Sequence, residues 1–126
     1  MATFQRFSDI HGWQSAKELA VAIYAMTAES PLDRDFGLRD QLRRSATSVM
    51  SNIAEGFGRG GDREFSRYLD IARGSAAEVQ SLLALIAAIH PHLKPRCDDL
   101  TDAADRTILL IARLAAYLNK VDKDTQ

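Results

Sequence analysis

Apolar residues recur every three or four positions along most of this 126-residue chain, which is the spacing of helices with one buried face. The pattern falls into four blocks and predicts helices over about residues 9–28, 35–55, 62–90 and 95–121. None of the blocks alternates like a strand, and the connections are short, so successive helices should lie antiparallel. We therefore expect an all-α, up-down-up-down four-helix bundle that forms one domain over residues 1–126.

Two glycines are informative about packing. Gly56 follows the second apolar block and is predicted to end that helix as a glycine cap. Gly74 lies in the middle of the third helix, where glycine costs about 1 kcal/mol relative to alanine, so we expect another helix to approach it closely. The run from Gly56 to Gly61 formally matches G-x-G-x-x-G. A helix precedes it instead of a strand, so it is interpreted as a turn between helices.

Helices two and three each carry a second face beside the core face. Small, polar and apolar residues line up there at helical spacing, and two interpretations stay open: a wide core, or an interface between copies of the chain. The candidate interface residues are Ser45, Ser48, Tyr68, Ile71 and Ser75.

Composition excludes some classes of protein. Hydrophobic residues make up 46% and charged residues 26%, with a net charge of −1, which is typical of a globular domain and not of a chain that coats nucleic acid. The single Cys97 excludes an internal disulfide and fits a reducing compartment. The start of the chain lacks a signal-peptide pattern, and the longest apolar run, Leu82–Ile89, is too short to span a bilayer. We expect a cytoplasmic protein without a membrane partner.

Arginines gather in the middle of the chain. Arginine binds phosphate through two parallel hydrogen bonds, so this set is a candidate contact surface for RNA or DNA. The candidate residues are Arg39, Arg43, Arg44, Arg59, Arg63 and Arg67.

The same arginines have acidic neighbours at helical spacing, which predicts ion pairs within the chain as the alternative. The expected pairs are Glu55 with Arg59, Glu64 with Arg67, Asp70 with Arg73, and Asp40 with Arg43 or Arg44. Because acids nearly match bases here, the sequence favours pairing over phosphate binding.

Metal and catalytic patterns are weak. No glutamate has a histidine three residues later, as a di-iron bundle requires, and His90, His92 and Cys97 match no standard zinc spacing. We expect no catalytic residue, no metal site and no cofactor.

Taken together, several motifs resemble a known family. They lie within about residues 4–90 and comprise Trp13-Gln14 with Ala16, Gln41-Leu42-Arg43-Arg44-Ser45 with Ser48, Asn52-Ile53-Ala54-Glu55-Gly56, Arg59, Glu64-Phe65, Tyr68-Leu69, Ile71-Ala72, Gly74-Ser75 and Glu78. With these motifs the chain resembles the small four-helix-bundle proteins encoded by intervening sequences in bacterial 23S rRNA genes. The same fold group includes accessory proteins of diversity-generating retroelements.

The resemblance implies a cytosolic bundle with no known enzyme activity and a tendency to assemble into rings, of which the pentamer is the best known. Asn52, Glu55, Gly56, Gly74 and Ser75 are the strongest family positions, and they are interpreted as structural. We expect a non-enzymatic scaffold that associates with itself, with a pentamer favoured. The alternative is an accessory module that contacts RNA or DNA through the arginines, and a protein partner also stays open.

Overall fold

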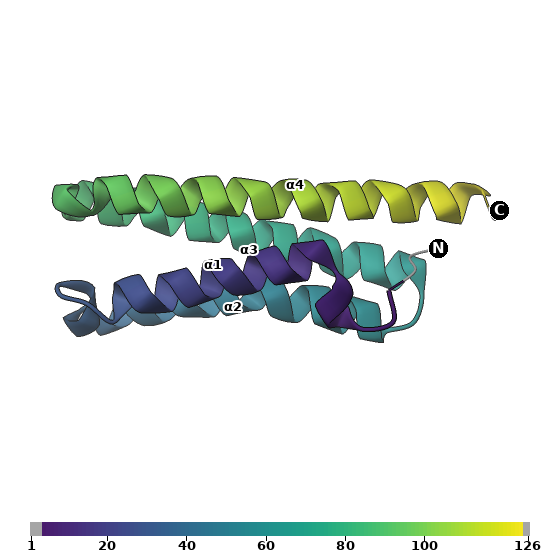
Figure 1. Ribbon diagram of the computed structural model, residues 1–126, viewed down its shortest axis with the longest axis horizontal. Helices are drawn as coiled ribbons and strands as arrows, with labels where there is room; N and C mark the ends of the chain where they lie inside the picture. Colours follow the sequence, from purple (N-terminus) through teal and green to yellow (C-terminus); the bar gives the residue numbers. More distant parts are fainter. Residues whose placement is uncertain (1–3, 125–126) are drawn as a thin grey trace.

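The computed structural model describes residues 4–124, and the side chains of residues 4–121. Figure 1 shows long helices side by side along one axis, and the described part of the chain contains no strand. The elements in order are η1 (Phe7–Asp9), α1 (His11–Thr27), η2 (Leu32–Arg34), α2 (Phe36–Gly58), α3 (Asp62–Ile89), η3 (Pro91–Leu93) and α4 (Lys94–Asp124). The predicted all-α four-helix bundle is confirmed.

Each helix contacts two of the other three. α2 packs against α1 and α3, and α4 packs against α3 and α1. α1 and α3 do not contact each other, so they lie diagonally across the bundle. Short connections reverse the chain between successive helices, so α1 and α3 point in the same direction.

The core follows the predicted periodicity. The predicted apolar stripe of α3 is buried, and so is that of α2 apart from the partly buried Leu38. Met50 packs against both halves of the core. Each fully buried leucine, isoleucine or phenylalanine contributes about 1.5–3 kcal/mol to stability. The fully buried large side chains include Ile23, Leu42, Ile53, Leu69, Leu83, Ile86, Ile111 and Leu118.

Three helix boundaries differ from the predicted ones by two or three residues. α1 begins at His11 because a short 3₁₀ turn precedes it, and α4 continues to Asp124. α2 does not end at Gly56 but runs on to Gly58. The chain instead turns at Gly60, the only described residue with a positive φ, at 85°. Gly56 therefore has a packing role and not a capping role.

One outer side of α3 is apolar and uncovered. By length and composition, α3 is long and apolar enough to cross a membrane, a test that the core helix of a soluble protein also passes. The sequence analysis considered only the run Leu82–Ile89 and missed this property. Only 33% of its most apolar window is buried in the bundle, although the opposite side packs on α2 and α4. The helix thus carries more apolar surface than one bundle uses.

Candidate functional site

A seam of polar side chains joins α2 to α3. The hydroxyls of Ser48 and Ser75 lie 2.8 Å apart in a hydrogen bond between the two helices. Asn52 donates from Nδ2 to the Ser48 carbonyl at 2.8 Å and to its hydroxyl at 2.9 Å. Polar groups at a half-buried position need such partners, and here they find them within the chain.

The seam continues toward the start of α2. Ser45 is buried, and its Oγ donates to Glu78 Oε2 at 2.6 Å. Gln41 donates to the same carboxylate oxygen at 3.5 Å. Hydrogen bonds to a charged group are among the stronger ones, so Glu78 is held in place on α3.

The seam changes how the five predicted interface residues are interpreted. The hydroxyls of Ser45, Ser48 and Ser75 make hydrogen bonds between α2 and α3 of one chain. Ile71 is 41% exposed and Tyr68 is half-buried. Of the five, Ile71 presents an apolar surface outward, whereas the guanidinium groups of Arg59 and Arg67 lie over the Tyr68 ring.

Gly56 lets α2 and α3 pack closely together near the turn. A Cβ built at residue 56 would lie 2.6 Å from the Cβ of Tyr68 and 3.1 Å from Cδ1 of Phe65. Arg59 covers the same place: it donates to the Tyr68 hydroxyl at 2.8 Å and pairs with Glu55 at 3.3 Å. The glycine and its neighbours therefore fix the end of the hairpin.

Gly74 has no such contact. Nothing lies within 4 Å of a Cβ built there, so the close approach predicted for Gly74 does not occur within the subunit. The difference between the two glycines depends on which side of its helix each one occupies, and Gly74 is on the exposed side of α3.

The structure divides the six candidate arginines into two groups. Arg39, Arg43 and Arg44 lie near the start of α2, whereas Arg59, Arg63 and Arg67 surround the turn at its other end. Arg43 and Arg59 are sixteen positions apart, about 24 Å along a helix. A single continuous arginine patch is therefore not formed.

The first group serves mainly to join α2 to its surroundings. Arg43 Nε donates to Thr27 Oγ1 at 2.8 Å, and its guanidinium lies 4.4 Å from the centre of the Tyr24 ring. Arg39 pairs with Asp40 at 2.8 Å, and this hydrogen bond lowers the pKa of the Asp40 carboxyl. Asp40 was predicted to pair with Arg43 or Arg44, and that prediction is wrong, because Arg43 turns toward α1 instead.

The second group is largely paired as predicted. Arg67 makes two hydrogen bonds to Glu64, at 3.1 and 3.2 Å, which lower the pKa of Glu64 and raise the pKa of Arg67. The pairs Glu55 with Arg59 and Asp70 with Arg73 are also present. Arg63 makes no ion pair in the part of the chain that the structure describes. It lines a hollow of about 270 Å³ between α3 and α4, together with Asp62, Ser66, Arg67, Asp70, Leu118 and Asn119.

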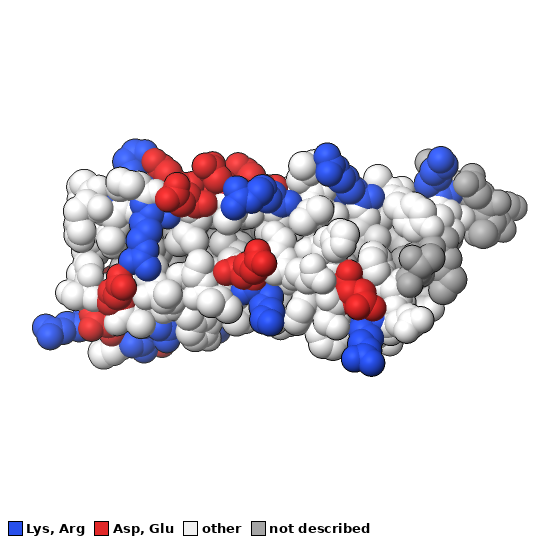
Figure 2. All heavy atoms as spheres, viewed as in Figure 1, with Lys and Arg blue, Asp and Glu red and all other residues white. Residues whose placement is uncertain are grey.

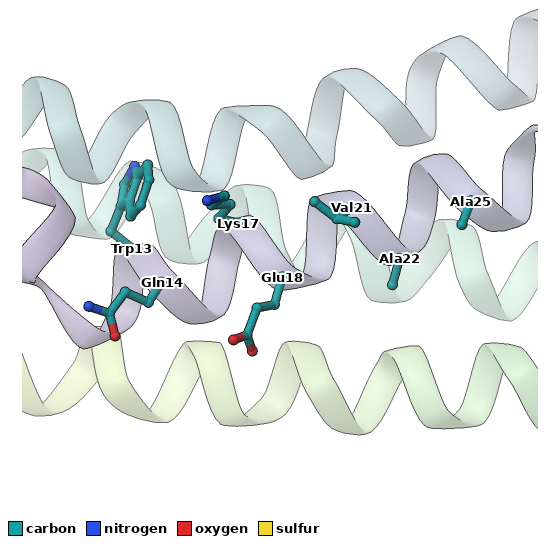
Figure 3. Close-up of a pocket in the computed structure, with 7 residues that line it drawn as sticks. All are labelled: Trp13, Gln14, Lys17, Glu18, Val21, Ala22 and Ala25. Carbon is teal, nitrogen blue, oxygen red and sulfur yellow. The ribbon is translucent and has the colours of Figure 1, made fainter.

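A second hollow, of about 440 Å³, lies on the outer side of α1 and was missed by the sequence analysis. Figure 3 shows the side chains that line it, all from α1: Trp13, Gln14, Lys17, Glu18, Val21, Ala22 and Ala25. Val21 is 61% exposed, compared with 44% for Tyr24 on the same helix. The signal was present in the sequence, since residues 19–28 contain no charged residue although one side of that segment faces outward.

Two exposed surfaces, one on α1 and one on α3, are defined by their residues. The α1 face comprises Trp13, Lys17, Val21, Tyr24, Ala25 and Ala28. The α3 face comprises Ile71, Gly74, Glu78, Ser81, Leu85 and Ile89. Leu85 is 47% and Ile89 is 51% exposed, and Glu78 is the one charged residue in positions 74–89. Figure 2 shows that charged side chains instead crowd the upper edge of the molecule, over the first half of α4, while much of the front is uncharged.

Groups suited to metal or redox chemistry are few. Among residues 4–121, no three His, Cys, Asp or Glu side chains are arranged to hold a metal ion. Cys97 is buried, and burial raises the pKa of its thiol. A buried thiol with a raised pKa is a poor nucleophile.

Comparisons with known proteins agree with this fold. No curated protein matches the chain by sequence. A crystal structure of a protein of unknown function from the S23 ribosomal protein family of Bacteroides thetaiotaomicron is similar, with a TM-score of 0.75 and 21% identity. The similarity covers 83% of this chain and 95% of that one, and at this identity it shows the fold. The family model described as 23S rRNA-intervening sequence protein matches residues 8–120. The chain therefore belongs to the 23S rRNA-intervening sequence protein family.

Proposed function

We propose that this protein is a non-enzymatic scaffold of the cytoplasm that assembles with copies of itself, with a ring-shaped pentamer favoured. The observation that carries the proposal is the α3 face. Positions 74–89 hold one charged residue, and Leu85 and Ile89 leave about half of their surface in water. Contiguous apolar surface of this kind on a soluble protein marks an interaction site.

Gly74 adds a second argument for association. A glycine in a helix interior is unfavourable by about 1 kcal/mol, and nothing within the subunit uses the space that its missing side chain leaves. A helix from another copy can approach the backbone closely at that point. The cost of Gly74 is then offset in the assembly and not in the single chain.

A structural role also fits the polar groups. The hydroxyls between α2 and α3 bind each other or Glu78, and the lowered pKa values of Asp40 and Glu64 arise from hydrogen bonds to arginines. The hydroxyls hold α2 and α3 together, whereas each acid pairs with an arginine of its own helix, and no step of a reaction is needed to explain either. The proposal includes no cofactor and no membrane partner.

Light scattering on the purified protein at micromolar concentration tests the proposal. The expected result is one species whose mass is a multiple of the 13.9 kDa chain. On dilution, the mass should stay constant until the protein concentration approaches the dissociation constant of the assembly, and should then fall. A monodisperse monomer throughout the series would overturn the scaffold.

A second function is favoured by one observation at the turn between α2 and α3. Arg63 lies in the first turn of α3 without an ion pair among the described residues, and Arg59 and Arg67 are close to it in sequence on the exposed surface. Three arginines at a helix start are suited to phosphate, and a ring would repeat them around its axis. This supports an accessory module that binds RNA or DNA.

Titration into labelled RNA and DNA over a salt series tests this second function. Binding through phosphates should weaken steeply with salt, and charge reversal at Arg59 and Arg63 should abolish it. The matched control is Arg113→Glu on α4, which should bind like the wild type. Without binding even at low salt, the second function is excluded, and protein partners become the next class to test.

A further inference from the structure

The α1 face and the α3 face each combine large exposed apolar side chains with few charges. Residues 19–28 contain no charge, and positions 74–89 contain one, yet both segments have an exposed side. The outward side of α2 exposes mainly polar residues such as Arg44 and Ser51. The first half of α4 exposes Asp99 and Asp102, although its second half also exposes Leu109 and Tyr117. Each bundle thus presents two separate apolar faces to water.

The two faces cannot cover each other within one chain. α1 and α3 lie diagonally in the bundle and make no contact, so their outer sides point in different directions. A chain with two different uncovered faces can cover both with one kind of contact when each face binds the other kind on a neighbouring copy. Such a head-to-tail contact closes into a ring when the rotation between neighbours allows it.

We propose that the α1 face of one copy binds the α3 face of the next copy, with the bundles parallel and at the same height. This inference rests on the self-association proposed above and names the surfaces that carry it.

The two faces lie at matching positions along the bundle axis. At one end, Gly12 of α1 lies beside Ile53 of α2, while Gly56, one turn further along α2, lies beside Tyr68 of α3. At the other end, Arg43 of α2 contacts Tyr24 of α1, and Ser45, two residues later, contacts Glu78 of α3.

The region from Val21 to Ala28 is therefore level with the region that starts near Glu78 and continues toward Leu85. Since α1 and α3 also run in the same direction, a rotation about an axis along the bundle brings one face onto the other without sliding.

Lys17 on the α1 face and Glu78 on the α3 face have opposite charges, and Glu18, which also lines the hollow on α1, points to the α4 side in Figure 3. Lys17 is the cation of the α1 face, and its ammonium lies 5.7 Å from the centre of the Trp13 ring. Glu78 is the anion of the α3 face, fixed by Ser45 and Gln41. Neither makes an ion pair in the described part of the chain, and their levels differ by about one helical turn.

A contact between two α3 faces would instead leave both Glu78 carboxylates without a cation. The α1 face also offers the hollow of about 440 Å³, whose lining includes the small side chains of Ala22 and Ala25, as a place for the larger apolar side chains of α3.

Two single substitutions and their mixture test the pairing. Val21→Glu blocks the α1 face and Leu85→Glu blocks the α3 face, and both positions are exposed in the single bundle, so the fold should survive. Alone, each variant should be monomeric by light scattering. Mixed in equal amounts, they should form a dimer with one copy of each variant. The unchanged α3 face of Val21→Glu then binds the unchanged α1 face of Leu85→Glu. Leu109→Glu on α4, where the leucine is 49% exposed, is the matched control and should keep the wild-type mass.

The outcomes separate this inference from the scaffold itself. A monomeric wild type overturns both. An oligomeric wild type whose mass survives Val21→Glu or Leu85→Glu overturns the pairing alone. Two monomeric variants that stay monomeric when mixed also overturn it. Circular dichroism of each variant verifies the fold. Sedimentation of the wild-type protein with lipid vesicles, lost in Val21→Glu or Leu85→Glu, would indicate that a membrane covers these faces and would overturn the pairing.

A charge exchange provides the second test. Lys17→Glu should lower the oligomeric fraction, because it places two carboxylates in one contact. The double variant Lys17→Glu, Glu78→Lys should form more oligomer than Glu78→Lys alone, because both lack the hydrogen bond from Ser45 but only the double variant restores opposite charges. An equal oligomeric fraction in Glu78→Lys and the double variant would contradict the proposed contact between these two residues.

Discussion

Gly56 lies so close to Tyr68 that a Cβ at residue 56 would stand 2.6 Å from the Cβ of the tyrosine. This contact sets the distance between α2 and α3 at the hairpin end. We predict that Gly56→Ala lowers the free energy of unfolding by about 1–3 kcal/mol, the usual cost of overpacking. Urea unfolding measures the change. The control is Gly37→Ala, where nothing lies within 4 Å, and it should be neutral or slightly stabilising. Equal stability of the two variants would contradict the close approach.

Ser45 joins α2 to the carboxylate of Glu78 through a 2.6 Å hydrogen bond. Ser45→Ala should cost about 1–2 kcal/mol of unfolding free energy, because it removes a hydrogen bond to a charged group. Ser51→Ala, at an exposed position on the same helix, should change stability by less than about 0.5 kcal/mol. Both are measured by urea unfolding at one protein concentration, since association adds to stability. A cost at Ser51 equal to that at Ser45 would contradict the role of the seam.

Stability should decrease in acid. Hydrogen bonds to Arg39 and Arg67 lower the pKa values of Asp40 and Glu64 below their ordinary values of 3.8 and 4.5. The folded state therefore binds fewer protons than the unfolded state in this range. The stabilisation is fully present above the unfolded pKa values and is lost as the pH falls through the folded ones.

The double variant Asp40→Asn, Glu64→Gln should thus lose less stability than the wild type between neutral pH and about pH 3. Thermal unfolding followed by circular dichroism gives both curves. Parallel curves for the two proteins would mean that these ion pairs do not contribute to the pH dependence of stability.

Cys97 should be unreactive in the folded protein. It is buried near the start of α4, and burial raises the pKa of its thiol, so little thiolate is available to react. A chromogenic disulfide reagent should modify the native protein much more slowly than the same protein in urea. Rapid modification without denaturant would show that this end of α4 opens readily.

Helical periodicity was sufficient to predict the core. Leu42, Val49 and Ile53 in α2, like the predicted stripe in α3, are buried because only one side of each helix can face its neighbours. Ion pairs three or four residues apart, such as Glu64 with Arg67, were also predictable, because helix geometry alone brings them together.

Contacts between helices were not predictable in the same way. Gly56 and Gly74 look alike in sequence, yet one meets Tyr68 and the other faces open space. Arg43 was expected to pair with Asp40 but binds Thr27 on α1, sixteen positions away. Such contacts depend on how the helices are rotated against each other, and a single sequence does not state that rotation. The hollow on α1 was missed for the same reason, because its shape also depends on how the helices are rotated against each other.

Native mass spectrometry of the wild-type protein tests the central claim most directly, because it counts the copies in the assembly. The account predicts one dominant species made of several 13.9 kDa chains, with a pentamer favoured. It also predicts that Leu85→Glu converts this species to single chains, whereas Leu109→Glu does not. A wild-type spectrum that contains only single chains at micromolar concentration would contradict the account.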